Sequence, residues 1–75
     1  MTKLPQANGD RLLRALQKDG WEIERTRGSH FVLVNRRDRS KTVVVPAHNR
    51  PIKVGTLAAI LKGAEMSPER LRELL

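Results

Sequence analysis

The stretch WEIERTRGSHFVLVNRRDRSKTVVVP, residues 21–46, decides the fold, because it contains three short runs typical of β-strands. The runs cover residues 21–27, 30–35 and 42–45. Gly28-Ser29 forms a tight turn between the first two, residues 36–41 form a polar hairpin loop, and Pro46 ends the third, since proline is tolerated at a strand end. Strands joined by short polar loops pair as antiparallel hairpins. The stretch therefore predicts a three-stranded antiparallel sheet.

The sequence on either side of this stretch predicts helices. From Gly9 to Asp19 apolar residues follow helical spacing, with Asn8 as the N-cap and Gly20 in the left-handed position that often ends a helix. The same spacing recurs after the sheet, at Val54, Leu57, Ile60, Leu61 and Ala64. Ser67-Pro68-Glu69 then predicts the start of a last short helix. We expect an α+β fold in one domain, residues 1–75.

The positive charge of the chain is concentrated in its middle. The 75 residues carry a formal net charge of +7. The segments before residue 25 and after residue 53 are each balanced, so the whole excess lies in residues 25–53, together with both histidines, His30 and His48. A localised basic field indicates a surface that binds a polyanion. The alternative is a solvated hairpin that keeps the protein soluble. A membrane is the weaker candidate, because the sequence contains no basic amphipathic helix with aromatic anchors.

Composition excludes several classes of protein. The chain has no cysteine, so it has no disulfide, and a structural zinc site is not expected. No stretch is apolar enough to span a membrane, and residues 1–8 lack the apolar segment of a secretory signal, so none is expected. Nucleotide-binding glycine loops and serine-nucleophile motifs are absent from the sequence. We therefore expect a cytoplasmic protein without metal or cofactor.

The candidate site is Arg27-Gly28-Ser29-His30. RNA cleavage requires removal of a proton from a 2′-hydroxyl and delivery of one to the departing 5′-oxygen, and histidine suits either role. Arg27 and Lys41 are expected to lie close enough to neutralise the phosphate. The other predicted RNA contacts are Gly28, Ser29, Arg36, Arg37, Arg39 and His48. Two alternatives stay open: His30 is a phosphate contact rather than a catalyst, and His48 is a second proton-transfer group or an ordinary loop residue.

The last two strands are apolar on both faces. Phe31 and Leu33 point one way, Val32 and Val34 the other, and residues 43–45 are all valine. Two helices can cover only one face of such a sheet, so either the C-terminal helix or a partner protein is expected to cover the rest. This leaves two rival functions beside cleavage, namely a non-catalytic RNA-binding module and a protein-interaction subunit.

An ordered set of short motifs, spread over almost the whole chain, is similar to one known family. The motifs are Lys3-Leu4-Pro5, Gly20-Trp21, Arg27-Gly28-Ser29-His30, Val43 to His48, Lys53 to Leu57, Ile60-Leu61-Lys62 and Met66 to Leu75. In this order and spacing the chain resembles the HicA toxins of HicBA toxin–antitoxin systems. It departs from the family pattern at Glu65, where a glycine is expected, so the turn there is expected to differ.

The resemblance implies a fold like that of a double-stranded-RNA-binding domain. It also implies metal-independent cleavage of mRNA, arrest of translation and neutralisation by a HicB-type antitoxin, with the toxin monomeric alone and part of a hetero-oligomer with its antitoxin. The family's catalytic histidine falls on His30, and its preceding turn on Gly28 and Ser29. His48 matches a position where the family often has histidine. Folds of the implied type recognise phosphates and 2′-hydroxyls more than base sequence.

Overall fold

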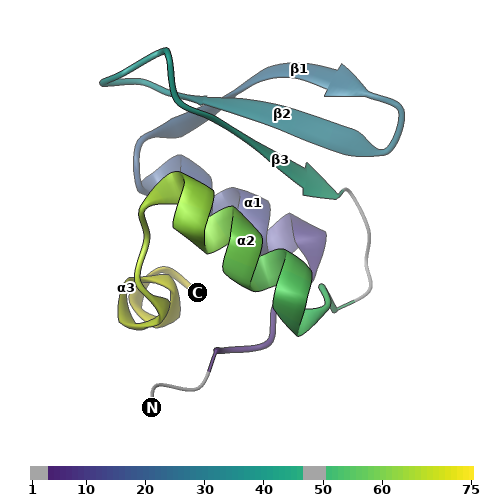
Figure 1. The fold of residues 1–75 in the computed structure, drawn as a ribbon, viewed down its shortest axis with the longest axis vertical. Helices are drawn as coiled ribbons and strands as arrows, with labels where there is room; N and C mark the ends of the chain where they lie inside the picture. The colour runs from purple at the N-terminus through teal and green to yellow at the C-terminus, as the bar shows by residue number, and fades with distance from the viewer. Residues whose placement is uncertain (1–3, 47–50) are drawn as a thin grey trace.

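The computed structural model of the protein describes residues 4–46 and 51–75. The elements follow the order α1 (Gly9–Lys18), β1 (Trp21–Arg27), β2 (His30–Asn35), β3 (Thr42–Pro46), α2 (Val54–Ala64) and α3 (Pro68–Leu74). The three strands form one antiparallel sheet in the order β1-β2-β3. The helices lie on one side of this sheet (Figure 1). The predicted α+β fold is confirmed.

The helices begin and end where the sequence signals lie. The Asn8 side chain accepts a hydrogen bond of 2.9 Å from the backbone N–H of Arg11, which satisfies a donor that α1 leaves unpaired. Gly20, with φ +97°, follows the end of this helix. The Ser67 side chain accepts a hydrogen bond of 3.1 Å from the backbone N–H of Arg70, so α3 is capped in the same way.

The core fills the space between the sheet and the helices. Its buried members are Leu12, Ala15, Leu16, Trp21, Leu33, Val43, Val45, Leu57, Ile60, Leu61, Ala64, Met66 and Leu71. Leu71 on α3 is fully buried although α3 packs against α1 and not against the sheet. The C-terminal helix therefore completes the core beneath the other helices, and does not cover the second face of the sheet (Figure 1).

Cross-strand pairing sorts the strand residues onto two faces, because directly paired residues point their side chains to the same side. We call the side packed on the helices the inner face and the opposite side the outer face. Leu33 is paired with Val43 on the inner face, and Val32 is paired with Val44 on the outer face. His30 shares the outer face with Val32 because it lies two residues away on the same strand.

A register shift in β1 changes which of its side chains share a face. Trp21 and Ile23 pair with inner-face residues of β2, and the register then shifts between Ile23 and Arg25. After the shift Arg25 is paired with Val32, and Arg27 with His30. Strict alternation from Trp21 would have placed both arginines on the inner face. The extra residue of this β-bulge places them on the outer face instead, which is how bulges re-aim side chains.

The outer face exposes less aliphatic surface than its sequence suggests. Val34 is fully buried and Val32 is 8% exposed, whereas Val44 is 48% exposed. Glu22 lies beside Val34 on this face as its cross-strand partner, and it forms an ion pair with Arg39 at 2.8 Å.

The far half of the β1–β2 hairpin extends beyond the helices. Its turn projects past the ends of α1 and α2 at the right of Figure 1. On the inner face, Ile23 is 39% exposed whereas Trp21 is buried. No helix within residues 4–46 and 51–75 has the length and apolar character needed to cross a membrane.

Candidate functional site

The turn between β1 and β2 consists of Gly28 and Ser29 alone. Gly28 has φ +58°, a conformation that L-residues with a side chain rarely adopt, and the first central position of a type II′ hairpin turn requires it. A Cβ added at Gly28 would meet nothing within 4 Å, so the backbone angle and not crowding demands glycine. The turn is therefore tight and open on its outside, and leaves space for a ligand to approach.

His30 lies immediately after this turn and is exposed on the outer face. It is flanked on one side by Arg27 of β1 and on the other by Pro46 of β3, its two cross-strand partners. Directly paired side chains have Cβ atoms about 5 Å apart. The structure thus pairs exposed His30 with exposed Arg27 across the two strands.

Arg25 is a second cation on the same face, one that the candidate motif did not include. It lies one outer-face position along β1 from Arg27 and is exposed. None of the ion pairs found among residues 4–46 and 51–75 involves Arg25 or Arg27. Counting from Trp21, strand alternation assigns Arg25 to the inner face, whereas counting back from the Gly28-Ser29 turn pairs it with Val32 on the face of His30, and the bulge reconciles the two.

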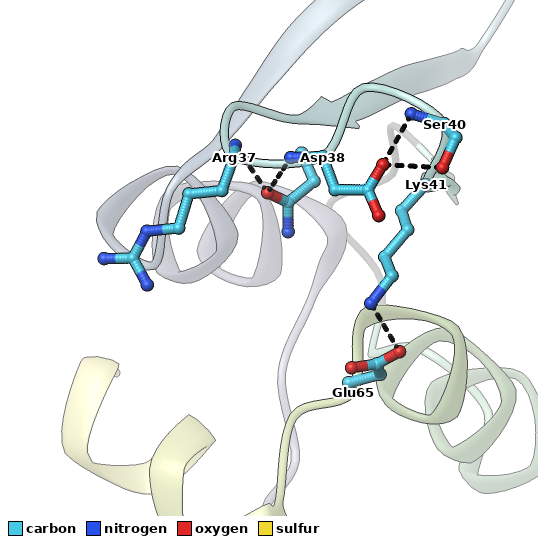
Figure 2. Close-up of polar contacts among 6 residues, drawn as sticks. Arg37, Asp38, Ser40, Lys41 and Glu65 are labelled. Atoms are coloured by element: carbon cyan, nitrogen blue, oxygen red, sulfur yellow. Dashed lines mark hydrogen bonds and ion pairs between the residues drawn. The ribbon is translucent and has the colours of Figure 1, made fainter.

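The loop between β2 and β3 is held by its own side chains (Figure 2). The Asn35 side-chain oxygen accepts hydrogen bonds from the backbone N–H groups of Arg37 and Asp38, at 2.8 and 3.1 Å. The Asp38 carboxylate accepts from the Ser40 hydroxyl at 2.6 Å and from its backbone N–H at 3.1 Å. These hydrogen bonds from Ser40 lower the pKa of Asp38 below its ordinary value.

Lys41 lies far from His30, which corrects the prediction that it neutralises the same phosphate as Arg27. It ends the loop at the opposite end of β2, about 17 Å from His30 at the usual rise per residue. Its Nζ turns toward the helices and donates to Glu65 Oε1 at 2.7 Å (Figure 2). This hydrogen bond raises the pKa of Lys41. The physical reason for the error is register, because the hairpin loop and the first turn lie at opposite ends of the sheet.

The remaining loop cations also lie at the far end of the sheet. Arg39 is engaged with Glu22, whereas Arg36 and Arg37 are exposed. Together with Lys41 they form a separate basic region rather than part of the surroundings of His30. His48 and the neighbouring residues 47–50 lie outside the described residues, although β3 ends at Pro46, the cross-strand partner of His30.

The described residues offer no cluster for a metal ion. No group of three or more histidine, cysteine or acidic side chains with suitable geometry occurs in this part of the chain. The polar groups described at the turn are the imidazole of His30, the guanidiniums of Arg25 and Arg27, the hydroxyl of Ser29 and the backbone of Gly28-Ser29. Such groups bind a phosphate and move protons.

Fold and site together define a small α+β domain with a histidine and unpaired cations on the open face of its sheet. Residues 9–66, more than half of the chain, match the family described as the HicA toxin of bacterial toxin–antitoxin. The chain belongs to this family, and is the toxin component of a toxin–antitoxin system, which implies an antitoxin partner. A search of curated proteins finds no match.

Proposed function

We propose that the protein is an endoribonuclease that cleaves mRNA in the cytoplasm, arrests translation and is neutralised by a HicB-type antitoxin. The observation that carries the proposal is the pairing of His30 with Arg27 on an exposed sheet face, in a chain of the HicA family. The imidazole supplies a proton acceptor or donor, and the guanidinium supplies charge for a phosphate. RNA is the substrate that uses both, because it carries its own nucleophile.

In the proposed reaction the 2′-oxygen of a ribose attacks the adjacent phosphorus while its proton is removed. The bond from phosphorus to the 5′-oxygen of the next nucleotide breaks, and that oxygen takes up a proton. His30 performs at least one of the two proton transfers. Arg27 stabilises the negative charge that builds on the phosphate oxygens. The expected products are a 2′,3′-cyclic phosphate and a free 5′-hydroxyl, with no metal required.

The test is cleavage of a defined RNA by the purified protein in the presence of EDTA. Cleavage that survives chelation and disappears in His30→Ala supports the enzyme, as does loss of toxicity on expression of that variant. The variant is expected to keep its fold because His30 is exposed and contributes nothing to the core. Normal growth arrest by His30→Ala would remove His30 from the mechanism.

A non-catalytic RNA-binding module is the second candidate, because an exposed histidine beside an arginine is also a good phosphate contact. This candidate predicts salt-dependent RNA binding with no cleavage under any of the same conditions. Mass spectrometry of the RNA separates the two functions, since only the enzyme generates cyclic phosphate ends. RNA binding that is weak and insensitive to salt would instead favour a protein-interaction subunit.

We propose further that the antitoxin covers His30 or the sheet face beside it. The support is that no described helix covers the outer face, where Val44 is 48% exposed near the site. Val44→Ser is expected to weaken antitoxin binding while RNA cleavage is retained. Val54→Ser is the matched control, because Val54 is 67% exposed at the start of α2, outside the sheet. A complex in which His30 stays open to solvent would contradict the proposal.

A further inference from the structure

We propose that Arg25 forms a second phosphate site, which holds the phosphate next to the one being cleaved in an RNA strand running along β1. This inference rests on the proposed function and deepens it, since it names the part of the substrate that a second residue recognises. Arg25 does not reach the reacting atoms in this arrangement. It is a positioning residue, and its contribution is to the affinity for RNA that extends beyond the scissile phosphate.

The first support is the β-bulge. Because the register shifts between Ile23 and Arg25, both Arg25 and Arg27 lie on the face of His30. If β1 had no bulge and Trp21 stayed on the inner face, strand alternation would direct both guanidiniums toward the helices. A bulge beside a functional site commonly serves to re-aim a side chain. Here it converts an amphipathic strand into one whose first half packs on the core and whose second half presents cations outward.

The second support is spacing. Arg25 and Arg27 are two residues apart along the strand, which corresponds to about 6.6 Å. This is of the same order as the separation of successive phosphates along one nucleic-acid strand. A phosphate held at Arg27, beside the His30 imidazole, therefore has its neighbour near Arg25. One face of one strand then binds two consecutive phosphates.

The third support is the distribution of anions. Arg25 and Arg27 take part in none of the ion pairs found in the described part of the chain, so their charge is available to a ligand. Further along the same face the next paired residue is Glu22, a carboxylate held by Arg39. Glu24, the exposed and unpaired residue of the bulge, also precedes Arg25 directly, so the cationic row ends at Arg25. This limits the track on β1 to two phosphates.

The experiment measures RNA binding apart from cleavage. A short single-stranded RNA is titrated by fluorescence anisotropy, at several salt concentrations, against protein carrying His30→Ala. Adding Arg25→Gln is expected to weaken binding roughly tenfold, because a charge-assisted hydrogen bond is lost. The slope of log affinity against log salt is expected to fall by about 0.7, the loss of one phosphate contact on a single strand. Arg25→Lys is expected to retain the slope.

Two controls separate position from net charge. Arg14→Gln removes an exposed arginine on α1, on the helical side, and is expected to leave the salt slope unchanged. The exchange Arg25→Thr with Thr26→Arg keeps the composition but moves the cation to the inner face, since Thr26 is paired with Phe31. It is expected to behave like Arg25→Gln. Thermal unfolding verifies that each variant is folded. If the double exchange does not fold, the comparison of Arg25→Gln with Arg25→Lys still tests the phosphate site.

Cleavage assays use protein in which His30 is intact, and the parent is the chain without any substitution. With a dinucleotide, which contains only the scissile phosphate, Arg25→Gln is expected to cleave as the parent does, whereas with longer RNA its KM rises and its kcat is unchanged. An unchanged salt slope in Arg25→Gln would overturn the second site even if the parent cleaves RNA. Absence of cleavage by the parent, with a reduced slope in Arg25→Gln, would overturn the nuclease and keep the phosphate site.

Discussion

Lys41 Nζ lies 2.7 Å from Glu65 Oε1, and this ion pair ties the loop between β2 and β3 to the end of α2. It lies on the helix side of the sheet, at the end away from His30. Residues 25–53 carry the whole positive excess of the sequence, but the folded protein neutralises part of that charge. Glu65 engages Lys41 and Glu22 engages Arg39 at the far end of the sheet, whereas Arg25 and Arg27, on the face of His30, take part in none of the ion pairs found within residues 4–46 and 51–75.

Lys41→Gln is therefore expected to leave the cleavage rate on short RNA unchanged. Arg27→Gln, a change of the same type, is expected to lower kcat because its guanidinium is next to His30. Single-turnover cleavage of one oligonucleotide by both variants measures the difference. Equal losses in the two would show that the loop cations reach the scissile phosphate.

Glu65→Gly is expected to stabilise the protein. Glu65 has φ +54° and is the only residue other than glycine with positive φ among the described residues. It ends α2 in a Schellman arrangement, in which the Met66 N–H donates to the Leu61 carbonyl at 2.9 Å. Relief of left-handed strain outweighs the greater freedom of glycine in the unfolded chain and the loss of the exposed ion pair with Lys41, which leaves a gain of up to about 1 kcal/mol.

Thermal unfolding of Glu65→Gly should then show a Tm several degrees higher, since about 1 kcal/mol corresponds to roughly 4–8 °C in a domain of this size. Glu65→Gln is the control, because it removes the carboxylate while keeping the strain. A Glu65→Gly variant less stable than Glu65→Gln would mean that the backbone conformation at this position is not strained.

Gly28→Ala is expected to destabilise the protein by about 1–2 kcal/mol, the cost of a left-handed conformation for a residue with a Cβ. The same change at Gly55, within α2 and with normal φ, is expected to stabilise by about 0.5–1 kcal/mol. Urea denaturation of the two variants measures both changes in the free energy of unfolding. Because the Gly28 turn pairs Arg27 with His30, cleavage should fall in Gly28→Ala only.

Leu71→Ala is expected to cost about 2–5 kcal/mol, the usual range for a large-to-small change in a core. Leu71 lies beyond residues 9–66 matched to the family, yet it is fully buried. Small domains have about 5–15 kcal/mol of stability in total, so the loss is a large fraction of it and should clearly lower the urea midpoint followed by circular dichroism. Leu74→Ala, at a half-buried position of the same helix, should cost less.

The loop between β2 and β3 is expected to loosen only in strong acid. The Ser40 hydrogen bonds lower the pKa of Asp38 from 3.8, so the folded state favours its carboxylate. Their contribution is present above pH 3.8 and is lost as the pH falls through the lower folded-state pKa. The Ser40 amide resonance in NMR should titrate with a midpoint below 3.8. Asp38→Asn should abolish that titration.

Local patterns in the sequence predicted the elements well. Asn8 and Ser67 cap the helices, Pro46 ends the last strand, and Gly28 takes the positive φ that the first turn needs. These features depend on neighbours in the chain. They were predictable because each residue type has a strong conformational preference of its own.

Long-range placement was not predictable from the same patterns. The partner of Lys41 is Glu65, on another element, and no local rule connects them. The bulge before Arg25 is equally hidden, because EIERTR reads as ordinary alternation. Proximity to His30 is set by strand register, and a one-residue shift changes the face of every side chain that follows.

The position of α3 has a practical consequence for measurement. The chain ends next to α1, where Lys18 Nζ donates to the Leu74 carbonyl at 3.2 Å, on the far side of the helical layer from the outer face (Figure 1). A fluorophore or a biotin on a flexible linker at Leu75 would stand clear of incoming nucleic acid. Surface immobilisation through that end should orient every molecule with its histidine toward the bulk solution.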